Sequence, residues 1–138
     1  MGGYKLFAHT ADVGVVAKGD TFSDAMSWLA TGMFSIIADL DSVEPRDSLK
    51  ISVTSTDRDA LVVDWLNELI YRHETESFIP KTFHMSVDEV APSLIARCEG
   101  EHVDERRHVM RTAVKAATYH GLHTSYHGEW SIRVVLDV

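Results

Sequence analysis

The stretch that decides the fold is TFSDAMSWLATGMFSII, residues 21–37, which predicts a capped amphipathic helix. Thr21 stands three residues before Asp24, so its hydroxyl can accept from free N–H groups while the carboxylate reaches back to the first turn. Apolar residues then recur every three or four positions, at Phe22, Met26, Leu29, Met33 and Ile37. We therefore expect a helix that buries one face.

A second helix is predicted from Thr56 onward by the same two signals. Thr56 stands three residues before Asp59, which again suggests a cap at the helix start. The apolar positions that follow have helical spacing and are Leu61, Val62, Trp65, Leu66, Leu69 and Ile70. This helix, too, is expected to bury one face.

Most of the remaining chain alternates with a period of two or is rich in β-branched residues, which is typical of strands. The candidate strands are residues 13–17, 49–54, 82–87, 93–98, 109–119, 122–126 and 130–136. Turns are expected at His120-Gly121 and Gly128-Glu129, so the last three strands should form an antiparallel meander. The sequence predicts a two-layer α+β fold in which two amphipathic helices pack on one face of a mostly antiparallel, mixed sheet. No linker interrupts residues 1–138, so one domain is expected.

The composition excludes several classes of protein. There are 13 Lys and Arg against 21 Asp and Glu, a formal net charge of −8, which repels phosphate backbones. Direct nucleic-acid binding is not expected. Cys98 is the only cysteine, which excludes an intrachain disulfide and a cysteine-based zinc cluster. No apolar run approaches the ~20 residues that span a bilayer, so we expect no membrane association and a cytoplasmic location.

Carboxylates stand at both ends of the chain. Asp12 closes the polar stretch His9-Thr10-Ala11-Asp12 before an apolar strand, and Asp137 follows the last apolar strand, one residue before the α-carboxylate of Val138. Such a set would suit a hard cation such as Ca²⁺, which takes oxygen ligands. Spacing alone nevertheless favours the simpler interpretation, in which Asp12 makes a turn and Asp137 marks a frayed end.

Other polar residues give weaker signals when each is considered alone. His120, His123 and His127 would supply three zinc ligands, but their spacing favours a solvated hairpin. Lys115 lies among small residues in a predicted strand, where a lysine usually faces water, and Glu44 lies in a loop. The phosphate-loop, dinucleotide and serine-hydrolase motifs are absent.

Four segments taken together resemble the archease family. They are HTADVG at 9–14, LVVDWLNELIY at 61–71, VKAATYH at 114–120 and VLDV at 135–138, and they span almost the whole chain in order. The resemblance implies a strand-helix-strand-strand module and a role as a cofactor protein rather than an enzyme. The implied partner is an RtcB-type RNA ligase of tRNA splicing and RNA repair, whose guanylylation and multiple turnover the cofactor would promote.

The resemblance also implies site residues. Asp12 and Asp137 match the family's metal-binding aspartates, with the carboxylate of Val138 beside them, and Ca²⁺ is the expected ion, with Mg²⁺ or Mn²⁺ as alternatives. Glu44 and Lys115 match the family's functional glutamate and lysine, and His9 is expected only to support them. The family usually has a glutamate two residues before the lysine, where this chain has Ala113.

Two other functions remain open at this point. A metal-dependent phosphate or nucleotide hydrolase would use the same carboxylates to activate water. A general protein chaperone would need exposed apolar surface, which the segregated helix stripes do not suggest.

Overall fold

The computed structural model describes residues 2–138 except Thr10. The chain forms two long helices, one short 3₁₀ turn and seven strands. In chain order these are β1 (Gly3–His9), β2 (Asp12–Gly19), α1 (Phe22–Ile37), η1 (Leu40–Ser42), β3 (Asp47–Thr54), α2 (Arg58–Glu76), β4 (Phe78–Asp88), β5 (Ser93–His102), β6 (Ala116–Tyr126) and β7 (Trp130–Asp137).

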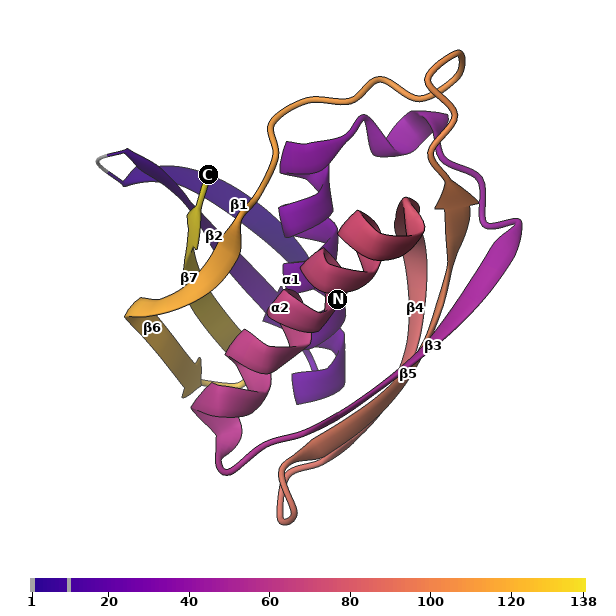
Figure 1. Cartoon of the computed structure of the whole chain (residues 1–138). Helices are drawn as coiled ribbons and strands as arrows, with labels where there is room; N and C mark the ends of the chain where they lie inside the picture. The colour runs from indigo at the N-terminus through magenta and orange to yellow at the C-terminus, as the bar shows by residue number, and fades with distance from the viewer. Residues whose placement is uncertain (1, 10) are drawn as a thin grey trace.

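The strands form two separate antiparallel sheets, ordered β1-β2-β7-β6 and β3-β5-β4. Both helices lie between the sheets (Figure 1). The first helix contacts β2 on one side and β4 on the other, and α2 contacts β6 and β3. The predicted α+β class and the antiparallel pairing are confirmed. The structure differs from the predicted arrangement in that the strands divide into two sheets, with the helices as a shared middle layer.

The buried surface of α1 explains this middle position. Its buried residues extend well beyond the predicted apolar stripe and include Ala25, Ala30, Phe34 and Ile36. A helix that covers one sheet needs a single apolar face, whereas a helix between two sheets must be apolar almost all round. The indole N–H of Trp65 on α2 donates to the main-chain oxygen of Met26 on α1 at 3.1 Å. The buried indole therefore has its hydrogen-bond partner and joins the two helices.

The start of α1 is as predicted, but the start of α2 is not. Thr21 accepts from the main-chain N–H of Asp24 at 3.0 Å, and the carboxylate of Asp24 accepts from the N–H of Thr21 at 3.3 Å. In α2 the cap is Asp57, whose carboxylate accepts from the N–H of Ala60 at 2.8 Å. The prediction that Thr56 caps α2 was wrong, because the helix begins one residue later than predicted. The cap position falls on Asp57, and an aspartate side chain accepts the hydrogen bond of a helix N-terminus as readily as a threonine does.

Residues 109–115 were predicted as part of a strand, and the structure contradicts this. The segment crosses the C-terminal end of α1, where the N–H groups of Arg111 and Thr112 donate to the carbonyls of Ile37 and Ile36 at 2.7 and 3.1 Å. The last carbonyls of a helix have no partner within the helix. The N–H groups of Arg111 and Thr112 are those partners, so the main chain at these two residues forms hydrogen bonds with the end of α1 and not with a neighbouring strand.

The predicted turn at His120-Gly121 is also absent, and β6 continues through it. Gly121 has φ +66°, and the β6–β7 register shifts between Thr118 and His123. This is a bulge, which bends a strand without reversing it. The turn near Gly128, which has φ +79°, is confirmed. In place of a three-stranded meander, β7 lies between β6 and β2.

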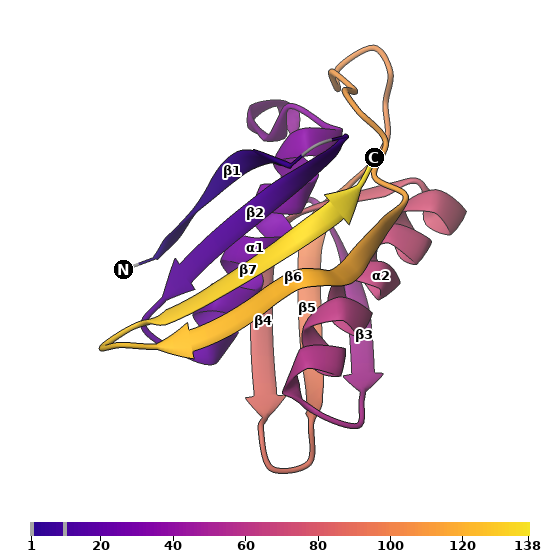
Figure 2. The same ribbon diagram turned by 90° about the vertical axis from the view of Figure 1, so that its left-hand side faces the viewer.

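Strand β1 was not predicted, and it adds an edge to the larger sheet. It pairs with β2 along its whole length, from Gly3↔Lys18 to His9↔Asp12. Figure 2 shows this sheet from its outer side, with the helices behind it. Among the described residues, no helix combines the length and the apolar character needed to cross a membrane.

The corrected cap of α2 gives a direct test. Asp57→Ala should lower the free energy of unfolding by about 1 kcal/mol, because the N–H of Ala60 loses its acceptor. Thr56→Ala is the matched control and should change the free energy little, since Thr56 is exposed and outside the cap. Urea unfolding of both variants measures the difference. A larger loss for Thr56→Ala would contradict this assignment of the cap.

Candidate functional site

The pairing of β2 with β7 brings Asp12 and Asp137 together. The last pair of this ladder is Val13↔Leu136, and Asp12 and Asp137 are the next residues along the two strands. Residues opposite one another in an antiparallel pair project from the same face of the sheet. Leu136 faces the core, so by alternation the two carboxylates project from the outer face at the end of the sheet.

Lys115 and Val138 lie beside this pair of aspartates. The β6–β7 register matches Ala116 with Asp137, and the N–H of Lys115 donates to the main-chain oxygen of Asp137 at 2.8 Å. The side chain of Lys115 is exposed, and Val138 packs partly against the core. Four of the predicted site residues therefore meet at one end of the larger sheet, although they come from opposite ends of the sequence.

Asn67 of α2 holds the start of β6 in place. The side-chain oxygen of Asn67 accepts from the N–H of Ala117 at 2.8 Å, and the side-chain Nδ2 of Asn67 donates to the carbonyl of Ala117 at 3.4 Å. The side chain thus acts like a short piece of neighbouring strand. Ala117 is two residues beyond Lys115, so Asn67 helps to fix where the lysine enters the sheet. Asn67 lies in the segment LVVDWLNELIY, where the sequence alone gave no sign of this role.

The expected metal ligands fit a cation only in part. Asp12 and Asp137 lie at the end of the β2–β7 ladder, next to Val138. The side chain of His9, which was expected only to support the site, lies outside the described residues. No group of three or more His, Cys, Asp or Glu side chains within the described structure is arranged to hold a metal ion. The zinc alternative at His120, His123 and His127 therefore gains no support. A metal at the aspartates would need the main-chain carboxylate of Val138 or a partner to complete its ligands.

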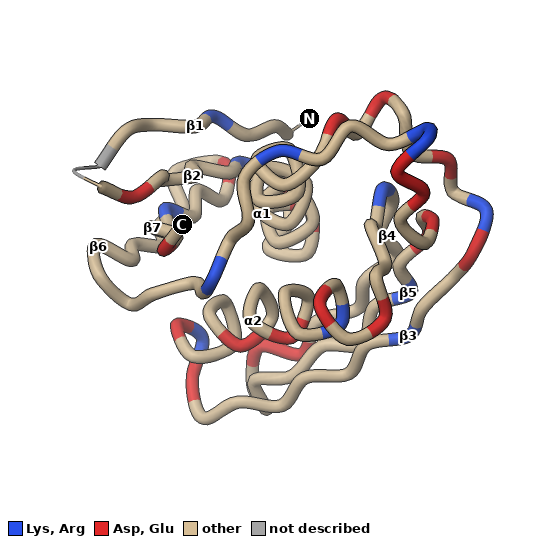
Figure 3. The backbone as a smooth tube through the Cα atoms, turned by 45° about the horizontal axis from the view of Figure 1, so that its top comes forward, with Lys and Arg blue, Asp and Glu red and all other residues tan. Residues whose placement is uncertain are grey.

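Glu44 lies elsewhere, in the connection between η1 and β3. Figures 1 and 3 both place this connection away from the C-terminal end of β7. The side chain of Glu44 is exposed, and its main-chain N–H donates to Oε1 of Glu101 at 2.8 Å. The structure therefore does not bring Glu44 to the aspartate pair. It ties Glu44 to a second polar cluster.

The centre of this second cluster is Glu101, which is only 5% exposed. Its carboxylate accepts from Nη2 of Arg107 and from the N–H of Glu44, and Nε of Arg46 lies 3.7 Å away. These contacts, the hydrogen bond from Arg107 first, lower the pKa of Glu101 to about 2, although burial opposes the shift. The ionised carboxylate thus joins residues 44–46 to the 101–108 segment.

His108 completes the cluster, and its contacts fix which ring nitrogen accepts a hydrogen bond. Its Nδ1 accepts from the N–H of Asp104 at 2.9 Å, so the ring proton belongs on Nε2, which lies 3.1 Å from Oε1 of Glu101. A neutral imidazole satisfies both contacts. The sequence alone gave no signal for Glu101, Arg107 and His108. The contact between Glu44 and Glu101 spans 57 positions, and the contacts of Glu101 with Arg107 and His108, six and seven positions apart, join the end of β5 to a loop that has neither a helical nor a strand period.

The lowered pKa of Glu101 predicts how stability depends on pH. Because the folded pKa lies near 2 and the ordinary value is 4.5, the stabilisation is complete above about 4.5 and is lost as pH falls toward 2. Glu101→Gln should be less stable than the wild type at neutral pH and should lose less stability on acidification. Urea unfolding between pH 7 and about 2.5 measures this. The exposed Glu105→Gln is the matched control, and parallel pH profiles for wild type and Glu101→Gln would contradict the assignment.

Comparison with known proteins shows the family of the chain. The family model described as the Archease protein family (MTH1598/TM1083) matches residues 4–138. The chain is 33% identical to Protein archease of Methanothermobacter thermautotrophicus over 141 aligned positions, covering 100% of both chains. It is 30% identical to Protein archease of Sulfurisphaera tokodaii over 136 residues, with 98% of each chain covered.

A solved structure shares the fold. The solution structure of Methanobacterium thermoautotrophicum protein 1598 superposes with a TM-score of 0.82 at 32% sequence identity, covering 99% of each chain. Sequence and fold thus agree over nearly the full length, and the chain belongs to the archease family.

Proposed function

We propose that this protein is a non-enzymatic cofactor that activates an RtcB-type RNA ligase by promoting its guanylylation and its multiple turnover. Membership in the archease family supports a role as a tRNA-splicing ligase cofactor. The observation that carries the proposal is the meeting of Asp12, Asp137 and Lys115 at one end of the larger sheet. The two aspartates lie on neighbouring strands, and Lys115 comes directly before β6, with its main chain bonded to that of Asp137 and its side chain exposed.

A divalent metal ion, with Ca²⁺ expected and Mg²⁺ or Mn²⁺ as alternatives, would bind at Asp12 and Asp137 with the carboxylate of Val138. Neither aspartate side chain has an ion pair or hydrogen bond within the described part of the chain. Like charges opposite one another on neighbouring strands repel, and a bound cation would remove that repulsion. Such an ion, when bound, would supply coordination sites for phosphate or carboxylate oxygens. The protein's own residues would position it at the edge of the sheet.

The charge distribution supports a basic protein partner. Figure 3 shows acidic positions along α2 and around η1 and β3, in keeping with the net charge of −8. A ligase that holds RNA needs a basic surface, and opposite charges steer two proteins together. The same acidic surface repels free RNA. The cofactor would therefore serve RNA repair without binding RNA itself.

A guanylylation assay tests the role of the aspartates. Asp12→Asn and Asp137→Asn should each reduce stimulation of the purified ligase by at least about tenfold, because a ligand carboxylate is lost while side-chain size is kept. Glu74→Gln on α2 removes the same charge from an exposed position away from the larger sheet and should reduce stimulation far less, because it weakens only the general attraction to a basic partner and removes no metal ligand. Full stimulation by both aspartate variants would rule out this mechanism. Turnover of GTP by the isolated protein would instead favour the metal-dependent hydrolase.

Metal binding can be measured without the ligase. We expect Ca²⁺ to raise the melting temperature of the isolated protein, because a ligand that binds only the folded state stabilises it, by about 2.7 kcal/mol at a hundredfold excess over Kd. Asp12→Asn should remove this shift, and Glu74→Gln should keep it. Parallel titrations with Mg²⁺ and Mn²⁺ identify the preferred ion. If no divalent ion shifts the melting temperature, the site does not hold a metal in the free protein.

A further inference from the structure

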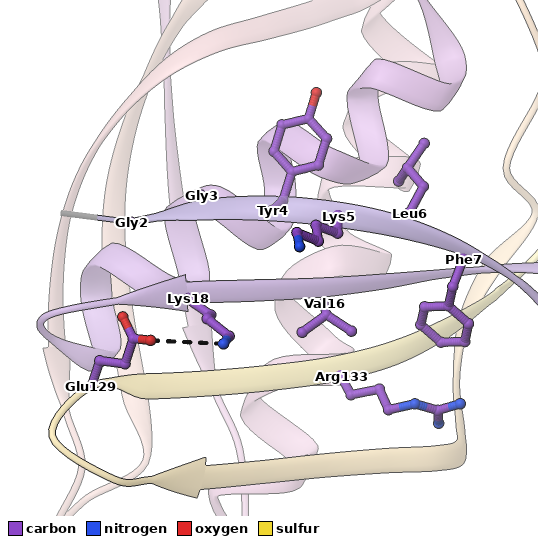
Figure 4. A pocket seen from close by; sticks show the side chains of 10 residues that line it. All are labelled: Gly2, Gly3, Tyr4, Lys5, Leu6, Phe7, Val16, Lys18, Glu129 and Arg133. Atoms are coloured by element: carbon purple, nitrogen blue, oxygen red, sulfur yellow. Dashed lines mark ion pairs between the residues drawn. The ribbon is translucent and has the colours of Figure 1, made fainter.

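The outer face of the larger sheet carries a groove that plays no part in the proposed ligase role. The hollow has a volume of about 740 Å³ and follows β1 from Gly2 to Phe7, with Val16, Lys18, Glu129 and Arg133 on the neighbouring strands. No helix covers this face, since both helices lie on the other side of the sheet (Figure 2). Figure 4 shows Lys5, Lys18, Phe7 and Arg133 around the groove.

The strand registers arrange these side chains in rows across the sheet. One row contains Lys18 on β2. The next contains Lys5, Val16 and Arg133, and the third contains Phe7, Gly14 and Val135. Successive rows are about 6.7 Å apart, because alternate residues of a strand share a face. An extended peptide segment has the same repeat along its own length.

The third row forms a rigid apolar end of the groove. Phe7 lies over Gly14, where an added Cβ would come within 1.9 Å of the ring. The guanidinium of Arg133 lies 4.4 Å from the centre of the Phe7 ring and donates to the carbonyl of Gly121 at 2.7 Å. This stack of the Arg133 guanidinium on the Phe7 ring holds both side chains in place, because Phe7 also contacts Gly14 and Arg133 also donates to Gly121. The groove is therefore preformed.

The charge of the groove is opposite to that of the whole protein. It presents Lys5, Lys18 and Arg133 against a single acid, Glu129, whereas the chain as a whole carries −8. Lys5 is exposed and has no ion pair within the described residues. Lys18 has only an exposed ion pair to Glu129 at 3.8 Å, which contributes little and is easily exchanged. The two lysines are therefore available to an anionic occupant.

We propose that this groove docks an extended acidic segment of another protein, with carboxylates at two alternate positions and an apolar residue at the next alternate position. The carboxylates would meet Lys18 and the Lys5–Arg133 row, and the apolar side chain would contact Phe7. The cations are spread over two rows, and Arg133 is already engaged by Phe7 and Gly121. A single phosphate group needs converging donors, so the spread favours a peptide. The proposal does not rest on the ligase role.

A labelled peptide tests the proposal directly. The probe is a fluorescently labelled, capped twelve-residue peptide with a central Glu-Ser-Glu-Ser-Leu sequence. Its fluorescence anisotropy is measured at low salt while the full-length protein is added. We expect saturable binding that weakens with added salt. Lys5→Glu should weaken binding by about fivefold to tenfold, since it replaces an attraction with a repulsion. Lys50→Glu makes the same charge change on an exposed position of the other sheet and should have no effect.

Four results would overturn the proposal. The first is the absence of saturable binding, and the second is equal weakening by Lys5→Glu and Lys50→Glu. The third is stronger displacement of the probe by inorganic tripolyphosphate than by unlabelled peptide, which would make the groove a phosphate site. The fourth is a dimer in sedimentation that Lys5→Glu dissociates, which would make a second copy of this chain the occupant.

Discussion

The antiparallel pairing of β2 with β7 is the constraint on which the rest of the structure depends. These strands come from opposite ends of the chain and form the centre of the larger sheet, with β1 and β6 at its edges. A shift of this ladder by one residue would turn every side chain of one strand to the other face. The register places Leu136 in the core and therefore places Asp137 outside it, next to Asp12. Core packing and site geometry thus rest on one alignment.

The second constraint is the position of α1 between two sheets. The last carbonyls of a helix have no partner within the helix and need one from elsewhere in the chain or from water. The 109–112 segment satisfies the last carbonyls of α1, and the Glu101 cluster anchors the start of the same loop. This loop leads directly to Lys115 and β6. The position of a surface lysine therefore follows from the hydrogen-bonding needs of a buried helix.

One face of the larger sheet carries charges of both signs, separated by the Phe7–Arg133 stack. The aspartate pair lies at one end of this face, and Lys5 and Lys18 lie toward the other end, beyond Phe7. Alternation along the strands makes this possible, because the core controls only every second residue. The outward residues are free to form two chemically different surfaces side by side. The proposed metal site and the proposed peptide groove therefore use different residues.

The sequence by itself determined the elements whose signals are local. Periodicity and the Thr21–Asp24 cap predicted α1, the apolar stripe predicted α2, and the motifs around Asp12, Lys115 and Asp137 pointed to residues that the structure brings together. Only the tertiary structure decided that the strands form two sheets and that residues 109–115 serve α1. It also decided that Glu44 joins Glu101. The reason is physical: alternation along a chain shows which side of an element is buried, whereas the partner that buries it is set by contacts between residues far apart in sequence.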